Sequence, residues 1–168
     1  MEHLWAPWRM EYIQKAKDGG EDSCIFCSRI EKDEDEQNLI LLRSQKSFVI
    51  MNRFPYNNGH LMVVPYRHSG DILQLVPEEN QDLFLLIQIS VKALQQVMQP
   101  HAFNIGMNLG RVAGAGVEDH LHYHIVPRFN GDTNFMPVIG STKVISEALD
   151  QTYQKLRKAY QELTGDSK

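Results

Sequence analysis

Short apolar runs and two longer helical stripes divide the chain into its predicted elements. Runs rich in β-branched and large apolar residues, bounded by turn residues, predict strands. They cover residues 38–43, 47–52, 60–65, 102–109 and 120–127. Asn58-Gly59 lies directly before the third run and is a strong turn signal. We therefore expect strands that pair antiparallel through tight turns.

Two segments repeat their apolar residues at the spacing of a helix. Residues 78–98 place six of them near one face: Leu83, Leu86, Ile87, Leu94, Val97 and Met98. Pro77 suits the start of this helix and Pro100 stops it. Residues 146–163, with Ser146 at the N-cap position, carry a second stripe of Leu149, Tyr153, Leu156, Tyr160 and Leu163. About five antiparallel strands, a long helix between the third and fourth, and a C-terminal helix predict an α+β domain.

The composition adds limits on size, partners and location. The 168 residues predict one domain, with an extension over residues 1–37, a core over 38–163 and a frayed tail over 164–168. A net charge of −4 argues against a protein that binds nucleic acid through bulk electrostatics. The sequence has no apolar stretch long enough to span a membrane and no signal peptide. We therefore expect a cytoplasmic protein with no membrane partner.

The stretch DHLHYHIVPR, residues 119–128, holds three of the seven histidines of the chain. Side chains alternate between the two faces of a strand, so His120, His122 and His124 point the same way. Successive rings lie about 6.5 Å apart at the rise of a strand. Three interpretations are open: a solvated polar face, a metal site, or nucleophilic and acid–base chemistry.

The preceding strand and the loop after it favour chemistry on phosphate. Along that strand Asn104, Gly106 and Asn108 share one face, opposite an apolar face of Phe103, Ile105 and Met107. The loop that follows contains glycines at positions 110, 114 and 116. Successive backbone N–H groups in such a loop can form an anion-binding nest. Together with the histidine strand, these residues predict a phosphate site.

The two cysteines, Cys24 and Cys27, have the spacing of zinc ligands. A redox motif of the same spacing would need a thioredoxin-like strand and helix around it, which the sequence does not show. Two half-buried thiols that meet by chance remain the alternative. A zinc ion would need two further ligands from elsewhere in the chain.

The histidine stretch also resembles the signature sequence of a known protein family. HLHYHIV resembles the His-x-His-x-His-x-x signature of the histidine-triad (HIT) superfamily, and NRFPYNNGHLMVVPYRH lies upstream at the expected distance. LWAPWRMEYI, CIFC and GDTNFMPV resemble a bacterial branch similar to diadenosine tetraphosphate phosphorylases and hydrolases. The resemblance covers roughly residues 4 to 160 and implies a HIT-like fold.

The resemblance implies an enzyme in which the three histidines have different roles. His122 attacks the α-phosphorus of a dinucleoside polyphosphate and forms a covalent nucleotidyl-histidine, which water or phosphate then cleaves. His124 gives a proton or a hydrogen bond to the departing group, and His120 completes the triad. A histidine at position 124, where sugar-transferring relatives carry glutamine, favours hydrolysis or phosphorolysis. His60 matches a family position that is more structural than catalytic.

The resemblance also implies nucleotide contacts. Asn108 holds the α-phosphate, and Gly114 and Ala115 add backbone donors from the glycine loop. Asn52 contacts the ribose, although a turn residue at the end of a strand explains an asparagine there equally well. Asn134, in GDTNFMPV, reaches the outer phosphates of a long substrate.

Zinc-bearing relatives imply a structural, four-coordinate zinc ion on Cys24, Cys27, His68 and His120. On that interpretation one histidine of the three holds a metal while the next two carry out chemistry. Relatives of this fold also pair two protomers edge to edge, which implies a homodimer.

Three alternative functions remain open. A nucleoside phosphoramidate hydrolase would use the same His122. A nucleotide sensor without catalysis would not depend on that imidazole. A metalloenzyme with all three histidines on a catalytic metal would lose turnover to a chelator while its fold survives.

Overall fold

The structure is a computed structural model, and it describes residues 24–132 and 147–165. The elements, in chain order, are α2 (Ile25–Ile30), α3 (Asp35–Asn38), β1 (Ile40–Arg43), β2 (Ser47–Met51), β3 (Leu61–Pro65), the 3-10 turn η1 (Ile72–Gln74), α4 (Pro77–Met98), β4 (Ala102–Met107), the 3-10 turn η2 (Arg111–Ala113), β5 (Tyr123–Arg128) and α6 (Leu149–Thr164). None of the helices in these two ranges is long and apolar enough to cross a membrane.

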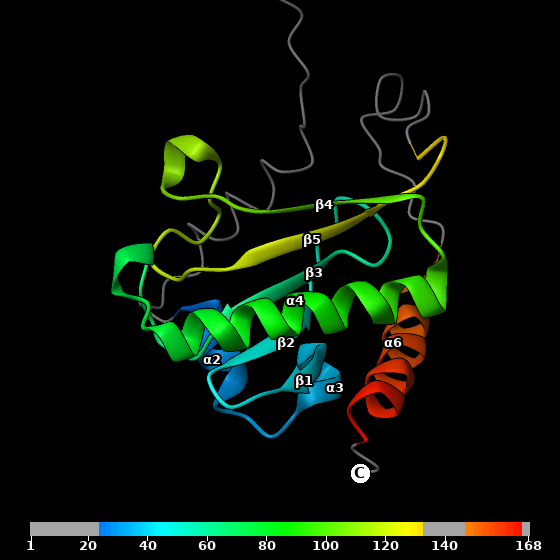
Figure 1. The fold of residues 1–168 in the computed structure, drawn as a ribbon, viewed down its shortest axis with the longest axis horizontal. Helices are drawn as coiled ribbons and strands as arrows, with labels where there is room; N and C mark the ends of the chain where they lie inside the picture. The colour runs from blue at the N-terminus through cyan, green and yellow to red at the C-terminus, as the bar shows by residue number, and fades with distance from the viewer. Residues whose placement is uncertain (1–23, 133–146, 166–168) are drawn as a thin grey trace, which may run out of the picture.

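The five strands form one antiparallel sheet in the order β1-β2-β3-β5-β4. The long helix α4 connects β3 to β4 and lies across the sheet (Figure 1). β5 therefore enters between β3 and β4, and β4 is left at an edge. This arrangement confirms the predicted α+β fold with five antiparallel strands, a long helix between strands and a C-terminal helix.

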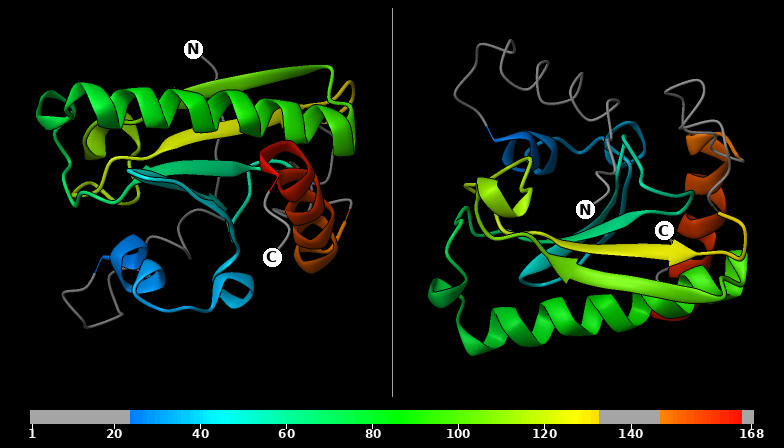
Figure 2. Two further views of the ribbon diagram at one scale, coloured as in Figure 1. Left: turned by 60° about the horizontal axis from the view of Figure 1, so that its bottom comes forward. Right: turned by 90° about the horizontal axis from the view of Figure 1, so that it is seen from above.

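Alternating side chains separate the two faces of the sheet into two clusters. On β2, Val49 and Met51 belong to the larger cluster, between the sheet and helices α4 and α6. Phe48 and Ile50 belong to the smaller cluster on the opposite face, where α2 contributes Phe26. Figure 2 shows α4 and α2 on opposite sides of the sheet. Each apolar side chain therefore reaches a covering helix on its own face.

The start of α4 is fixed to the loop that carries a predicted metal ligand. Pro77 is the first residue of the helix, and Glu79 accepts a hydrogen bond from the backbone N–H of Val76 at 3.0 Å. Glu79 also pairs with Arg67 at 2.8 Å. Burial is the largest single influence on Glu79 and raises its pKa, but the hydrogen bonds from Arg67 and the Val76 N–H, together with the nearby positive charges of Arg67 and Lys46, lower the pKa overall. The pair therefore anchors Arg67 directly beside His68.

Two differences from the predicted elements exceed a shift of one or two residues. Before β1 lies the short helix α3, which was not predicted; Arg43 binds the carboxylate of its first residue, Asp35, through two nitrogens at 2.9 and 2.8 Å. The strand expected over 120–127 begins only at Tyr123. Before that residue the Leu121 N–H donates to the Ser69 carbonyl at 2.8 Å, outside the sheet ladder.

The C-terminal helix begins and ends later than expected. It starts at Leu149 with Ala148 as its N-cap and runs to Thr164, where Gly165 adopts the left-handed conformation that ends helices. Thr164 and Gly165 are therefore part of an ordered helix end. Ser146 and residues 166–168 of the predicted tail lie outside the described residues.

Packing of α4 on the sheet predicts a strong position dependence of stability along this helix. Leu94 is fully buried in the larger cluster, so Leu94→Ala should lower the free energy of unfolding by about 2–5 kcal/mol. Leu85, on the same helix, is 49% exposed, and Leu85→Ala should cost less than about 1 kcal/mol. Urea denaturation followed by circular dichroism measures both values, and equal losses would contradict the packing described.

Candidate active site and metal centre

The histidine segment keeps its two faces even where it is not part of a strand. Leu121 and Ile125 are buried in the larger cluster under α4. The side chains of His122 and His124 lie on the α2 side, where the ring of Phe26 is 5.1 Å from that of His122. The rings of His122 and His124 are themselves 4.9 Å apart, edge to face.

The imidazole of His122 is held in one tautomer. It is 5% exposed, and its Nδ1 lies 2.8 Å from the backbone carbonyl oxygen of His120, so Nδ1–H is the donor. Burial lowers the pKa of His122, although the same hydrogen bond acts in the opposite direction. The ring is therefore neutral near pH 7, and its Nε2 carries a lone pair. That is the form an attacking imidazole needs.

His124 is held in the opposite tautomer through His60. The Tyr56 backbone N–H donates to His60 Nδ1 at 3.1 Å, so the remaining proton of that ring is on Nε2. His60 Nε2 lies 3.0 Å from His124 Nδ1 and donates to it. His124 therefore carries its own proton on Nε2. These tautomers are assigned from the hydrogen-bond partners.

His60 contacts both His124 and Tyr56, which agrees with the expectation that its position is more structural than catalytic. It is 1% exposed and stacks on the Tyr56 ring at 4.6 Å. The register of the sheet explains the contact with His124. Met62 is the partner of His124 across β3 and β5, so His60, just before β3, comes close to the histidine face.

Two pockets meet at the histidines. Pocket A is lined by residues that include Phe26, Asn52, Met62, Gly114, His122 and His124. Pocket B lies along β4 and β5 and is lined by residues that include Tyr56, Asn104, Gly106, Asn108, His124 and Arg128. Among the described residues, Tyr56 and His124 alone line both pockets, whereas His122 lines pocket A.

Asn52 and Asn108 lie in different pockets. Asn52 lines pocket A, and its Oδ1 also accepts the backbone N–H of Phe54 at 2.9 Å. It is therefore a turn residue and a pocket residue at once, so both interpretations of this asparagine remain compatible. Asn108 lines pocket B, just beyond the end of β4. Their contacts with a nucleotide stay predictions.

The glycine loop approaches pocket A at two positions. Gly114 lines the pocket with φ of +94°, a conformation that favours glycine, and Gly116 lines it as well. The N–H of Ala115 donates to the Gly110 carbonyl at 3.3 Å, and its side chain is buried. The proposed role of Ala115 as a phosphate donor stays a prediction. Asn134 lies outside the described residues.

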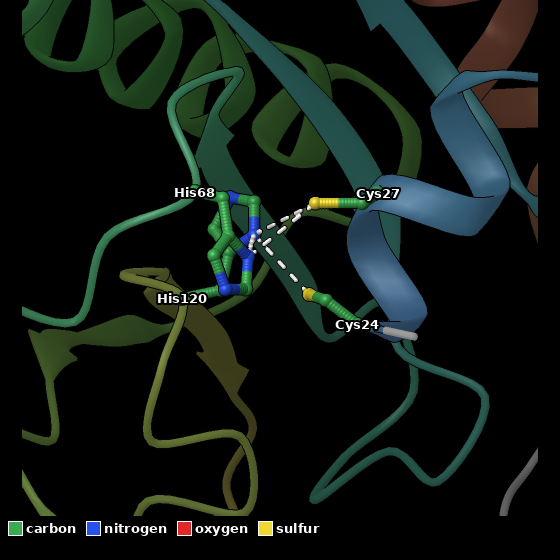
Figure 3. A group of neighbouring side chains, drawn as sticks. All are labelled: Cys24, Cys27, His68 and His120. Atoms are coloured by element: carbon green, nitrogen blue, oxygen red, sulfur yellow. Dashed lines mark hydrogen bonds between the residues drawn. The ribbon is translucent and has the colours of Figure 1, made fainter. Parts of the chain in front are cut away.

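The four predicted metal ligands converge, with one donor atom from each lying within 4.8 Å of the others (Figure 3). The Nδ1 of His120 lies 3.2 Å from Cys24 Sγ, 3.6 Å from Cys27 Sγ and 3.3 Å from His68 Nδ1. Tetrahedral zinc would separate two nitrogen ligands by about 3.3 Å and a nitrogen from a sulfur by about 3.6 Å. The donor set and its spacing therefore fit such an ion.

The surroundings of the cluster also fit a metal centre. The Nε2–H of His120 donates to the Pro65 carbonyl at 2.8 Å, which turns Nδ1 toward the sulfurs. Metal-bound histidines are commonly oriented by such a hydrogen bond from the ring nitrogen that does not bind the metal. Burial lowers the pKa of His120 and keeps its ring neutral. Burial, together with the neighbouring Cys24, raises the pKa of the Cys27 thiol to about 11. A bound cation would favour the thiolate instead.

Several known proteins are similar to this chain. A family model of the HIT domain matches residues 33–131. The AP-4-A phosphorylase of Mycobacterium tuberculosis is 37% identical over 93% of this chain and 83% of that protein. The adenosine 5'-monophosphoramidase hnt1 of Schizosaccharomyces pombe is 32% identical over 64% of this chain and 76% of that protein.

A similar solved structure is that of a Zn-bound histidine triad family protein from Mycobacterium smegmatis. Its TM-score is 0.68 at 25% identity, over 85% of this chain and 96% of that chain. The antiparallel sheet and the paired histidine tautomers define a protein of the histidine-triad class. The chain belongs to the HIT family. The comparisons also support the enzyme class predicted from the sequence, a HIT-type nucleotide hydrolase or phosphorylase.

The two tautomers are directly measurable. In long-range ¹H–¹⁵N spectra at pH 8, we expect protonated Nδ1 and bare Nε2 for His122, and the reverse for His124. His60→Ala removes the donor to His124 Nδ1, and its spectrum should then show both tautomers of His124. A wild-type His124 with its proton on Nδ1 would contradict the assignment.

Proposed function

We propose that the protein cleaves a phosphoanhydride bond of a dinucleoside polyphosphate through a covalent nucleotidyl intermediate on His122. The observation that carries this proposal is the bare Nε2 of a buried, neutral imidazole beside a second imidazole that presents Nε2–H. One ring is thereby suited to attack phosphorus, and its neighbour is suited to hydrogen-bond the group that leaves.

In the first step the lone pair of His122 Nε2 attacks the α-phosphorus. The bond from phosphorus to the bridging oxygen breaks, and its electron pair stays on the leaving polyphosphate. The Nδ1–H of His122 keeps its bond to the His120 carbonyl, which stabilises the positive charge that forms on the ring. The Nε2–H of His124 donates a hydrogen bond to the leaving oxygen without losing its proton.

The position of the protons on His60 and His124 favours a polyphosphate over an amine as leaving group. His60 already donates to His124 Nδ1, so a full proton transfer from Nε2 would leave an imidazolate, which is unfavourable. A polyphosphate departs as a stable anion and needs only the hydrogen bond. An amine must be protonated as it leaves. Phosphoramidate hydrolysis, the activity that names the Schizosaccharomyces pombe relative, is the second candidate.

We propose inorganic phosphate rather than water as the second acceptor. A phosphate dianion attacks the α-phosphorus without a base, the P–N bond breaks and its electron pair returns to His122 Nε2. Water would need a base, and the Nε2 of His124 is already protonated in this tautomer. The name of the Mycobacterium tuberculosis relative, a phosphorylase, supports the same acceptor.

We propose a structural role for zinc at the Cys/His cluster. The ion would be held by Cys24, Cys27, His68 and His120, and four protein ligands leave no position open for substrate. It would connect α2, which carries the Phe26 wall of pocket A, to the residue whose carbonyl orients His122.

We also propose that two copies pair through β4. This strand is the edge of the sheet beside β5, and most of its residues are exposed. An uncovered edge of this kind presents unpaired backbone groups to another strand.

The covalent intermediate predicts a trapped adduct. After incubation with diadenosine tetraphosphate and a quench in base, we expect the mass of AMP added to the peptide that contains His122. His122→Ala should abolish the adduct and lower turnover by about 10⁴-fold or more. His101→Ala is the matched control, because this exposed histidine lines neither pocket, and it should change neither result. Adduct formation in the His122→Ala variant would contradict the assigned nucleophile.

The products of the same assay identify the molecule that accepts the nucleotidyl group from His122. With phosphate present we expect ADP and ATP from diadenosine tetraphosphate. AMP and ATP in equal amounts at saturating phosphate would show that water is the acceptor.

The metal centre predicts a stability change that is separate from turnover. Metal analysis of the purified chain should find one zinc per protomer, and Cys27→Ser should lose it. A chelator should lower the free energy of unfolding by about 2–4 kcal/mol, the amount by which a tightly bound ligand stabilises a fold. Loss of turnover with unchanged stability would instead indicate a catalytic metal.

A further inference from the structure

We infer that pocket B is the subsite for the leaving polyphosphate, so the protein selects nucleotide conjugates whose leaving group is long and anionic. The inference rests on the proposed cleavage at His122. It gives a function to pocket B, which the attack of His122 on phosphorus does not itself require. It starts from the way in which pockets A and B meet.

His124 lies at the junction of the two pockets. The attacking Nε2 belongs to His122, which lines pocket A. In phosphoryl transfer the leaving oxygen departs roughly in line with the attacking atom and on the opposite side of phosphorus. The leaving group therefore moves away from His122, past the Nε2–H of His124, and pocket B is the space that His124 also lines.

The floor of pocket B is open where it meets His124. Gly106 is the partner of His124 across the β4–β5 pair, and a side chain built at this glycine would meet nothing within 4 Å. Asn104 and Asn108 lie on either side of Gly106 on the same face of the chain. The distance from Asn104 to Asn108 is about 13 Å at the rise of a strand. A trough of that length accommodates a chain of phosphates.

The groups along this trough are mainly hydrogen-bond donors. Arg128 Nη1 donates to Asn104 Oδ1 at 2.8 Å, and this bond assigns the amide so that its NH₂ group faces away from the guanidinium. Among the described residues that amide NH₂ has no partner. Asn108, the residue expected at the α-phosphate, adds a second amide at the other end of the pocket, and His124 adds its Nε2–H between them. Phosphate oxygens accept bonds from all three kinds of donor.

One carboxylate lies among the described residues that line pocket B, and its charge is compensated. Asp132 accepts two hydrogen bonds from Arg128, at 2.6 and 3.1 Å, and one from Asn57 Nδ2 at 2.7 Å. Arg128 is in turn fixed in position by this pair while its edge still points to Asn104. The Arg128–Asp132 pair therefore orients the asparagine and presents little net charge to an approaching anion.

Two variants test the subsite from different directions. Gly106→Val places a branched side chain on the open floor, and valine suits a strand, so the fold should be unaffected. Asn104→Ala removes one amide donor from the exposed side chains of β4 and leaves its backbone unchanged. Asn130→Ala is the matched control, because this exposed asparagine lines neither pocket.

The assay compares two substrates with the same AMP unit: diadenosine tetraphosphate, with a long anionic leaving group, and adenosine 5'-phosphoramidate, which releases only ammonia. We expect Asn104→Ala to lower kcat/KM for the tetraphosphate by about tenfold, the usual loss of one hydrogen bond to a charged group. Gly106→Val should lower it further. The value for the phosphoramidate should stay within about threefold in both variants, so the ratio of the two constants falls.

Nucleotide binding provides a second readout that is independent of turnover. By calorimetry, the variants should weaken ATP binding by tenfold or more and AMP binding by less than threefold, because only ATP has phosphates that reach pocket B. Parallel losses for both nucleotides, or no loss for either, would overturn the subsite. A wild-type protein that binds both nucleotides and turns over neither substrate would contradict the proposed function but leave the binding comparison valid.

Discussion

The hydrogen bond from His122 Nδ1 to the His120 carbonyl is the constraint on which the rest of the site depends. It is a bond of 2.8 Å between residues two positions apart, and regular strand geometry would direct that carbonyl to a neighbouring strand instead. The segment 120–122 is accordingly outside the ladder, and β5 begins at Tyr123. The departure from strand pairing is therefore the local condition that gives His122 a fixed tautomer.

That departure is stabilised by contacts on both sides of the segment. The Leu121 N–H donates to the Ser69 carbonyl, and the His120 ring donates to the Pro65 carbonyl. The acceptors are Pro65, the last residue of β3, and Ser69, four residues later. Between them lies Arg67, which is held by Glu79 at the start of α4. The histidine segment is thus positioned by the end of one strand and the beginning of one helix, which are rigid elements.

The sequence predicted most of the fold because its signals are periodic and local. The short apolar run 47–52 became the fully buried strand β2. The stripe predicted on α4 is buried at Leu83, Leu86, Ile87 and Leu94. The four metal-ligand candidates also converged, as the family resemblance implied. Two features escaped prediction. The start of β5 depends on bonds to Ser69 and Pro65, about 55 residues distant in sequence, which leave no local pattern.

The second such feature is the pairing of His60 with His124, which depends on register rather than on composition. A single histidine after an Asn-Gly turn gives no indication that its ring faces another ring across β3 and β5. Pocket B likewise requires the register that sets Gly106 opposite His124, because a glycine inside a strand is otherwise read as a weak point of the strand.

The three evenly spaced histidines have three different surroundings in the structure. The side chain of His120 faces the Cys/His cluster, while its backbone carbonyl accepts the Nδ1–H of His122. The hydrogen-bond partners leave the lone pair of His122 and the proton of His124 on Nε2. Two neutral rings of opposite tautomer placed 4.9 Å apart avoid the repulsion that two imidazolium ions would suffer at that separation. Neutrality of both rings is thus a condition of their proximity, and it suits a reaction in which the departing anion needs no proton.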